Sequence, residues 1–464
     1  MKTRESRFLM PTHSILRLAA ALLAPVTALT AGAQPTAKAP YTVTVFAAAP
    51  AGLTNPDSIT EGGGSIFVTY ANTSQPDGSG GPSTIVQYDP TGRIVRTFVV
   101  SGKNDGLKYN PFTRRLWALR NEDANPALTI IDPQTGAREH YTYAQPPSHG
   151  GGYDDVVFLQ GHTFISASNP TVLPSTPTTP NGQNVHPSVV EARLSGHQIT
   201  VSPVLKGNDP LSNVVTGKTD RSQQSDPDSL KVDAAGDLVL DSQADGDLIF
   251  INAPGSPQQA SLLLHLTNGT AKQITVDDTV FPTAPSGTVL VVDTKADTVY
   301  AVHSNAFQPG GAYSASDSDG ILGKVDLSTG FVNPIVTGMR SPHGALFIPD
   351  YPEVSIQRGA GLSFQGSTLT AAFLVTRLGD VSQALGIRYS VHAIASETND
   401  DQSFTGTIEI PAGQSGQAFN VPITSVSELA EDGVTQSALI ILEPGPGYNL
   451  GPSATAAVDL AKGG

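Results

Sequence analysis

The chain has 464 residues, with 41 Asp and Glu against 26 Lys and Arg, a formal net charge of −15 and no cysteine. The absence of thiols excludes disulfides, thiolate zinc sites, iron–sulfur clusters and a cysteine nucleophile. The acidic balance argues against a nucleic-acid partner, because phosphate backbones are bound by surfaces rich in Lys and Arg.

The N-terminal segment has the pattern of a secretory signal. Basic residues between positions 2 and 17 precede the apolar run LAAALLAPVTALTA, and Ala31-Gly32-Ala33 then supplies the small residues of a cleavage site. The apolar run is shorter than the roughly 20 residues of a membrane-spanning helix, and Pro25 interrupts it. We therefore expect residues 1–33 to be a signal peptide, with an uncleaved anchor as the alternative. The mature chain should be exported, to the periplasm or the extracellular space, without a transmembrane segment.

After residue 33 the sequence consists of short runs of β-branched, aliphatic and aromatic residues separated by turn clusters. Examples are SIFVTY (65–70), TIVQY (84–88) and LTII (128–131). No segment shows convincing helical periodicity. The sequence therefore predicts an all-β protein.

Two internal repeats make this prediction more specific. A turn motif of the type D-x-x-T-G, or its close relative DPTG, occurs at 89–92, 132–136 and 326–330. In such a turn Asp caps the chain reversal, and Gly adopts the positive φ that the reversal needs. A strand–turn–strand unit occurs as LVLDSQADGDLIFI (238–251) and again as LVVDTKADTVYAV (290–302). Repeats of about 40 to 50 residues with four strands each are typical of a β-propeller.

The repeats divide the first part of the chain into blades. Six blades are favoured, and five or seven are possible because residues 272–304 can be divided in two ways. The last repeat is too short for a whole blade, and YTVTVF (41–46) is expected to supply its missing outer strand. The innermost strands are expected to begin near Asp57, Asp105, Asp155, Asp228, Asp278 and His343.

Several blade segments resemble the NHL and SMP-30/gluconolactonase-like propellers of bacteria. They are PDSIT (56–60), NDGLKYNPFTRRLWAL (104–119), DPDSLKVDAAGDLVLDS (226–242) and SPHGALFIPD (341–350). The resemblance implies a β-propeller over residues 34–350.

The gluconolactonase-like family holds a divalent metal in the central channel with a Glu, Asn residues and an Asp. By resemblance, Glu61 and Asp228 are candidate metal ligands here. The paired Asn ligands of the family have no counterpart in this sequence.

From residue 351 the strands become longer and alternate more regularly. FLVTRLGD (373–380), the PAGQ turn within 406–423 and LEPGPGYNLG (442–451) occur in the order seen in the Calx-β family, which they resemble. The resemblance implies an Ig-like β-sandwich over residues 351–464.

Calcium-binding Calx-β domains use a Glu on the first strand, and here that strand (354–361) carries no acid. Calcium takes six to eight oxygen ligands. The reduced set therefore indicates a solvated acidic face rather than a preserved calcium site, which remains the alternative. The candidate ligands are Asp400, Asp401, Glu428, Glu431 and Asp432.

Polar residues at the starts of the inner strands should meet at one mouth of the propeller channel. They are Asp57, Asp105, Asp154 or Asp155, Asp228, Asp278 and His343. Several carboxylates around a narrow well repel one another unless a cation neutralises them. This predicts a site for a divalent ion, with Ca²⁺ favoured, or for a cationic ligand, and His343 would be a general base or an extra ligand. The sequence favours the simpler alternative, that these Asp residues only cap the turns that enter each strand.

Two classes of function stay open. In the first, the chain is an exported binding or interaction module of the cell envelope or extracellular space, with an unknown protein or small-molecule ligand. In the second, it is a metal-dependent hydrolase of the lactonase kind, with its site in the propeller channel. The sequence favours the first, because the family's metal ligands do not map onto it one for one.

Overall fold

The structure is a computed structural model, and it describes residues 34–270, 272–365, 368–394, 402–423, 437–451 and 453–459. The predicted signal peptide and the five candidate calcium ligands between Asp400 and Asp432 lie outside the described residues. Strands dominate, with two short 3-10 turns between them. Among the described residues, no helix is both long and apolar enough to span a membrane. The prediction of a nearly all-β protein is confirmed.

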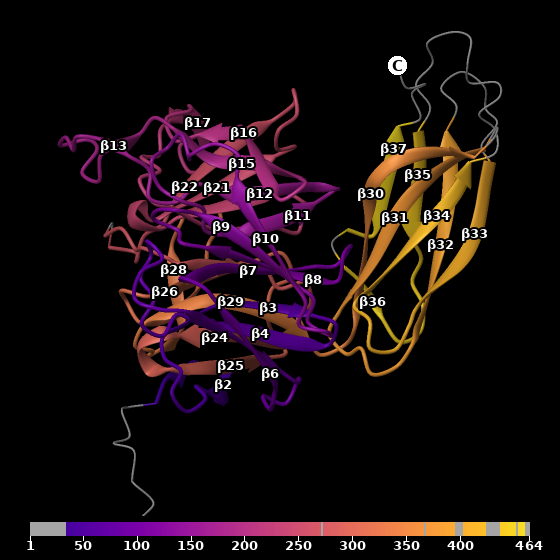
Figure 1. The fold of residues 1–464 in the computed structure, drawn as a ribbon, viewed down its shortest axis with the longest axis horizontal. Coiled ribbons are helices and arrows are strands. Elements are labelled where there is room, and N and C mark those ends of the chain that lie inside the picture. Colours follow the sequence, from indigo (N-terminus) through magenta and orange to yellow (C-terminus); the bar gives the residue numbers. More distant parts are fainter. Residues whose placement is uncertain are drawn as a thin grey trace, which may run out of the picture. The chain divides into compact units, whose positions relative to one another are not determined.

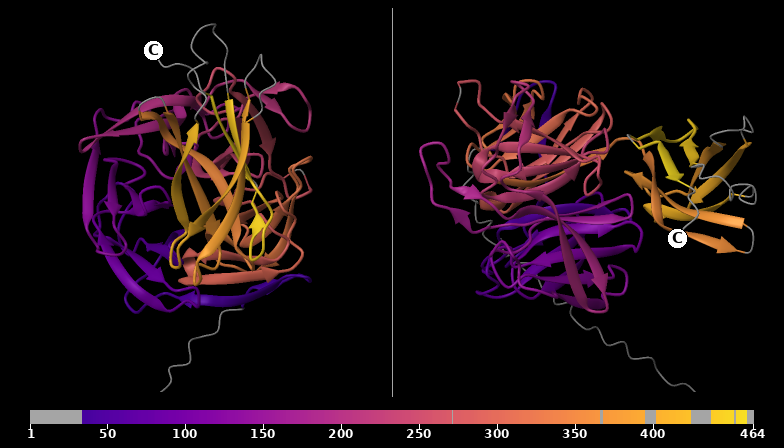
Figure 2. Two further views of the ribbon diagram at one scale, coloured as in Figure 1. Left: turned by 90° about the vertical axis from the view of Figure 1, so that its right-hand side faces the viewer. Right: turned by 90° about the horizontal axis from the view of Figure 1, so that it is seen from above.

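Six strands of the first part form a closed ring, and we call them the ring strands. Each contacts the next along the chain, and the last returns to contact the first. Figure 1 shows β3, β7 and β29 side by side, and in the left view of Figure 2 the colours progress around the ring. The ring strands are β3 (Pro56–Gly62), β7 (Asn104–Asn110), β11 (Val156–Leu159), β19 (Pro227–Val232), β23 (Asp278–Val280) and β29 (Pro342–Pro349).

Each of the first four ring strands begins a sheet whose strands follow one another outward. A parallel pairing of β10 with β16 joins the second and third sheets. The strands that follow the ring strands are β4 (Ser65–Tyr70), β5 (Ser83–Tyr88) and β6 (Ile94–Val100); β8 (Arg115–Arg120), β9 (Ala127–Ile131) and β10 (Arg138–Tyr143); β12 (His162–Ser166), β15 (Pro187–Ser195) and β16 (Gln198–Lys206); and β20 (Leu238–Ser242), β21 (Asp247–Asn252) and β22 (Ala260–His265). Short added strands are β13 (Val172–Leu173) and β14 (Gln183–Asn184), which form a separate hairpin, and β17 (Leu211–Asn213) and β18 (Thr219–Asp220), which extend the fourth sheet.

The hairpin that follows the fifth ring strand, β23, belongs to the sixth sheet, which contains β29. Strands β24 (Gly287–Asp293) and β25 (Thr298–Ser304) follow β23 in the chain but pair within the sheet of β29. The chain then returns to the sheet of β23 with β26, β27 and β28. This placement of the hairpin explains why residues 272–304 could be divided between blades in two ways. The returning strands are β26 (Ala312–Ser316), β27 (Ile321–Val325) and β28 (Val332–Thr337).

The N-terminal strands complete these two sheets. Strand β2 (Thr42–Ala48) pairs with β25 as the outer strand of the sixth sheet. Strand β1 (Thr36–Ala37) pairs with β28 at the edge of the fifth. The outer strand expected at 41–46 is therefore in the predicted place.

The sequence repeats also have the expected structure. The three D-x-x-T-G-type turns all join the third strand of a sheet to its fourth. In the first, the Asp89 carboxylate accepts the N–H of Thr91 at 2.9 Å, and Gly92 has a φ of 81°. The 238–251 and 290–302 units are β20–β21 and β24–β25, and each turns through a 3-10 segment, Gln243–Asp245 or Thr294–Ala296.

Apolar side chains of the middle strands form the core between neighbouring sheets. Leu240, Ile249 and Leu263 of the fourth sheet pack with Phe164 of the third. Burying such side chains contributes roughly 1.5–3 kcal/mol each. The only tryptophan, Trp117, is buried on β8 with its ring edge-on to Phe158.

The C-terminal part contains two four-stranded sheets. Residues from both, including Val354, Phe373, Val391 and Ile440, share one buried core. One sheet has the order β34–β31–β30–β36 and the other β33–β32–β35–β37. Their bounds are β30 (Glu353–Gln365), β31 (Thr368–Leu378), β32 (Leu385–Ile394), β33 (Gln402–Ile410), β34 (Gly416–Ile423), β35 (Ser437–Leu442), β36 (Asn449–Leu450) and β37 (Thr455–Asp459).

Candidate functional site

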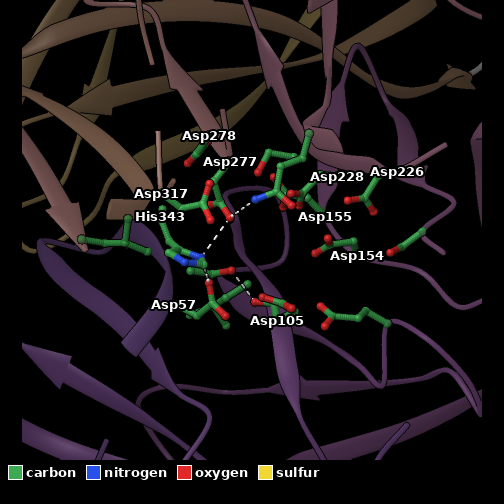
Figure 3. Close-up of a pocket in the computed structure, with 18 of the residues that line it drawn as sticks. Asp57, Asp105, Asp154, Asp155, Asp226, Asp228, Asp277, Asp278, Asp317 and His343 are labelled. Carbon is green, nitrogen blue, oxygen red and sulfur yellow. Dashed lines mark hydrogen bonds and ion pairs between the residues drawn. The ribbon is translucent and has the colours of Figure 1, made fainter. Parts of the chain in front are cut away.

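A cavity of about 340 Å³ lies where the ring strands begin, and we call it the channel cavity. Figure 3 shows acidic side chains pointing into it from different strands. Its lining contains eleven carboxyl groups, three lysines and one histidine. They are Asp57, Asp105, Glu122, Asp123, Asp154, Asp155, Asp226, Asp228, Asp277, Asp278, Asp317, Lys103, Lys108, Lys231 and His343.

The structure brings together seven of the residues expected at the channel mouth. Each of them lines the channel cavity: Asp57, Asp105, Asp154, Asp155, Asp228, Asp278 and His343. Glu61 does not line this cavity. It lies further along β3, where its carboxylate accepts the N–H of Gly64 at 3.3 Å. The structure therefore separates Glu61 from the other candidate ligands of the first part.

β-Bulges explain why consecutive residues face the cavity. Pro56 of β3 pairs with Tyr70 of β4, and the next pair is Ile59 with Val68. Between these two pairs β3 therefore contains one residue more than β4. The same shift occurs at the starts of β7, β19 and β29. Because a bulge adds one residue to one strand, it redirects side chains that would otherwise alternate. Asp57 and Ser58, and likewise Asp228 and Ser229, therefore all line the cavity.

Two glycines allow the ring strands to approach closely. A Cβ on Gly106 of β7 would lie 1.7 Å from the carbonyl oxygen of Asp154. A Cβ on Gly344 of β29 would lie 2.7 Å from the carbonyl oxygen of Asp57. Only a residue without a side chain fits at such distances. The N-D-G and P-H-G sequences thus place their polar residue beside the next ring strand.

Lys103 is an internal cation among three acids. Its Nζ lies 2.6 Å from Asp105 Oδ2, 2.6 Å from Glu122 Oε1 and 3.7 Å from Asp57 Oδ2. Burial lowers the pKa of Lys103, but the Glu122 and Asp57 carboxylates outweigh it and raise that pKa overall. Burial raises the pKa of Glu122 to about 7 even with Lys103 beside it.

A second group of charges in the cavity contains Lys108 and Lys231. Lys231 Nζ lies 2.7 Å from Asp278 Oδ1 and 3.6 Å from Asp155 Oδ2, and Lys108 Nζ lies 3.8 Å from Asp155 Oδ2. Asp155 also accepts the N–H of Leu230 at 3.1 Å, and Asp278 accepts the N–H of Ala345 at 2.7 Å. These two carboxylates therefore connect neighbouring ring strands and are compensated by lysines.

His343 lies between two carboxylates. Its Nδ1 is 2.9 Å from Asp277 Oδ1 and 3.3 Å from Asp57 Oδ1, and its Nε2 is 3.3 Å from Ser341 Oγ. Gln243 Nε2 donates to Asp277 Oδ1 at 3.0 Å. Burial lowers the pKa of His343, but Asp277 and Asp57 outweigh it and raise that pKa well above its usual value.

Asp154 and Asp228 form a carboxyl pair. Their carboxyl groups lie close enough to interact, and burial raises both pKa values well above the usual range. The charge of Glu122 raises the pKa of Asp154 further, and the charge of Asp154 raises that of Asp228. Two carboxylates at such close range cannot both ionise easily. A cation bound beside the pair would favour the ionised form of both groups.

Two groups of side chains are arranged so that they could hold a metal ion. The first is Asp57, Asp277 and His343, and the second is Asp105, Glu122 and Asp154. In each group one ligand atom per residue lies within 4.8 Å of the others. Lys103 already compensates two members of the second group.

The first group fits an ion better. In the tautomer where Nε2–H of His343 donates to Ser341, the Nδ1 lone pair faces both carboxylates. Metal-binding histidines are commonly oriented through their second nitrogen in this way.

Sequence reasoning missed several lining residues. Glu122 and Asp123 follow β8, and Asp317 lies between β26 and β27, so all three come from connections between the second and third strands of a sheet. Because adjacent strands are antiparallel, these connections lie at the same mouth as the ring-strand starts, and this was the available signal. The other missed residues are Asp226, Asp277, Lys103, Lys108 and Lys231.

No protein-family model matches the chain, and no curated protein matches it. Among solved structures it is similar to a candidate gluconolactonase, at 12% identity and a TM-score of 0.39, over 72% of this chain and 89% of that one. It is also similar to a protein of unknown function from Bacteroides thetaiotaomicron, at 11% identity and a TM-score of 0.38, over 73% of both chains. An exo-β-1,3-galactanase from Phanerochaete chrysosporium matches at 9% identity and a TM-score of 0.32, over 90% of this chain and all of that one. Likeness at this level supplies no argument about function.

Proposed function

We propose that this chain is a metal-dependent hydrolase of small esters or lactones, with its active site in the channel cavity. The observation that carries the proposal is the group of Asp57, Asp277 and His343 at the wall of that cavity. This reverses the preference drawn from the sequence, where an interaction module came first because metal ligands could not be mapped. Ligands of suitable chemistry do meet, but from positions that differ from the family pattern.

The proposal includes the architecture. The closed ring of six strands, each starting a sheet, supports a six-bladed β-propeller over residues 34–350. The two four-stranded sheets with a shared core support an Ig-like sandwich of the Calx-β kind in the following part. Export with a cleaved signal peptide stays part of the proposal, since the sequence pattern of residues 1–33 supports it.

The donor set bears on the choice of ion. Two carboxylates and an imidazole suit manganese or zinc, whereas calcium prefers oxygen ligands alone. Calcium, which the sequence favoured, would draw instead on the carboxylates of Asp154 and Asp228 beside this group. The experiment therefore compares several ions.

The surrounding residues have distinct roles in this proposal. A divalent ion at the group would polarise an ester carbonyl and lower the pKa of water. In this proposal one member of the Asp154–Asp228 pair donates a proton to the leaving alcohol, and the other accepts one from water. Ser341 and Gln243 orient His343 and Asp277. Lys103 keeps Asp105 and Glu122 compensated.

The test combines ion binding with activity. The full chain is stripped with chelator and titrated by calorimetry with Mn²⁺, Zn²⁺ or Ca²⁺, and hydrolysis of a panel of γ- and δ-lactones and p-nitrophenyl esters is followed. Asp277→Asn and His343→Gln should each weaken ion binding at least tenfold and abolish hydrolysis. His303→Gln is the matched control, because His303 is half exposed and pairs with Asp350 away from the cavity. A chain that binds none of the three ions would overturn the proposal, as would one that hydrolyses no substrate when loaded.

A further inference from the structure

We propose that the channel cavity binds a ligand through an ammonium or guanidinium group, which is held by Asp123, Asp226 and Asp317. We call these three the rim carboxylates. If the hydrolase proposal holds, its substrate is an ester or lactone that carries such a cation. The substrate class rests on the proposed function, whereas the binding site does not.

The rim carboxylates come from three separate connections and line one cavity. Asp123 follows β8, Asp226 precedes β19, and Asp317 lies between β26 and β27. Among the described residues, none of the three side chains has an ion pair within 4.0 Å or accepts a hydrogen bond. All three are partly exposed, so a ligand can reach them. No direct ion pair therefore neutralises them within the described part of the chain.

Asp154 gives a second, independent indication of a missing partner. Its side chain is buried, with the residue only 8% exposed, and it points into the cavity beside Asp228 in Figure 3. Its one polar partner is the carboxyl group of Asp228. No N–H or basic side chain of the described residues donates to it. A buried carboxyl group is costly unless it is paired, so the cavity lacks a cation at this depth.

The cavity already contains ammonium groups of the protein's own lysines. The Lys103 ammonium lies 2.6 Å from the carboxylates of two different residues, and the Lys231 ammonium lies 2.7 Å from Asp278 and 3.6 Å from Asp155. In each case an ammonium bridges acids from different segments of the chain. The rim carboxylates also come from different segments of the chain, and no lysine of the described residues pairs with them. A ligand's cation would do so by charge-assisted hydrogen bonds.

Size and charge agree with this ligand class. A cavity of about 340 Å³ accommodates a small molecule. Eleven acids against three lysines give the cavity a negative potential that attracts cations and repels anions. A carboxylate released by ester hydrolysis would be expelled by the same potential.

The first test measures binding without chemistry. Agmatine, which carries an ammonium and a guanidinium group but no ester, is titrated into the ion-loaded full chain by calorimetry. We expect binding that weakens at least tenfold in the double variant Asp226→Asn/Asp317→Asn. Asp319→Asn is the matched control, since Asp319 shares the β26–β27 turn but does not line the cavity. Asn removes only charge, and an unchanged Trp117 emission spectrum confirms folding of the variants.

The second test measures selectivity. Hydrolysis of Nα-acetyl-lysine methyl ester is compared with that of the norleucine analogue, which lacks the ammonium group. We expect kcat/KM to favour the lysine ester at least tenfold in the wild type and by less than twofold in the double variant.

The two proposals fail in different ways. Equal kcat/KM values for both esters, or agmatine binding unchanged in the double variant, would overturn the rim site and leave the hydrolase standing. Agmatine binding that depends on the rim carboxylates, with neither ester hydrolysed, would support the rim site and overturn the hydrolase.

Discussion

Replacing Lys103 with Met removes the ammonium and keeps a side chain of similar length. In the structure this ammonium is within 2.6 Å of Asp105 and Glu122 and 3.7 Å of Asp57, and the side chain is only 14% exposed. Removing one partner of a buried ion pair costs about 3–5 kcal/mol, because the remaining charge is left uncompensated. We therefore expect Lys103→Met to lower the free energy of unfolding by about 3–5 kcal/mol in the presence of chelator.

A divalent ion should recover much of this loss. Without the ammonium, Asp105 and Glu122 join Asp154 as a second group of ligands. An ion present at 100 times its Kd stabilises the folded state by about 2.7 kcal/mol. The difference in the free energy of unfolding between Lys103→Met and wild type should therefore shrink by about that amount. The number of ions bound per chain should rise by one.

Trp117 makes the measurement specific. It is the only tryptophan of the chain and lies on β8, next to the ring strand β7. Urea unfolding followed by its fluorescence therefore reports on the sheets around the cavity. Calorimetry gives the number of ions bound. Lys272→Met is the control, since the Lys272 side chain is 68% exposed and should have no measurable effect. A deficit below about 1 kcal/mol, or an unchanged ion stoichiometry, would refute the role of Lys103 as an internal cation.

Three further predictions follow from the same geometry. Gly106→Ala should lower the free energy of unfolding, measured in urea, by about 1–3 kcal/mol or more, because the new Cβ would lie 1.7 Å from the Asp154 carbonyl oxygen. A variant as stable as wild type would show that the two ring strands do not touch. Burial raises the pKa of Glu122 to about 7 and of Asp226 to about 6. The folded chain thus binds these protons more tightly than the unfolded chain, and its ion-free Tm should fall between pH 5 and pH 8. A Tm that rises over this range would contradict the reasoning, and a saturating divalent ion should flatten the decline. Asp293→Ala should lower the free energy of unfolding, measured in urea, by about 3 kcal/mol, because this buried carboxylate accepts three backbone N–H groups. Two of these lie just before β29, the strand that carries His343, so the variant should also bind the ion more weakly. An ion affinity equal to that of wild type would argue that Asp293 does not position His343.

Much of the fold could be predicted because its signals are local. Turn chemistry at Asp89 and its relatives placed the hairpins, and the twice-repeated strand–turn–strand unit placed the middle strands of two sheets. The approximate starts of the ring strands followed from the spacing of these units. Convergence of Asp57, Asp105 and His343 was then a matter of geometry, since ring strands that run in one direction begin at one mouth.

The sequence by itself thus determined the strand periodicity, the turns and the gathering of acids at one end of a ring. The tertiary structure alone decided which sheet receives the β24–β25 hairpin, because pairing between distant strands depends on packing rather than on local pattern. It also decided that Asp277 lies beside His343, whereas the next residue, Asp278, pairs with Lys231. Bulges at the starts of β3 and β19 change the face to which the following side chains point. The sequence shows no periodic pattern for these bulges, or for the lysines and loop carboxylates at the cavity.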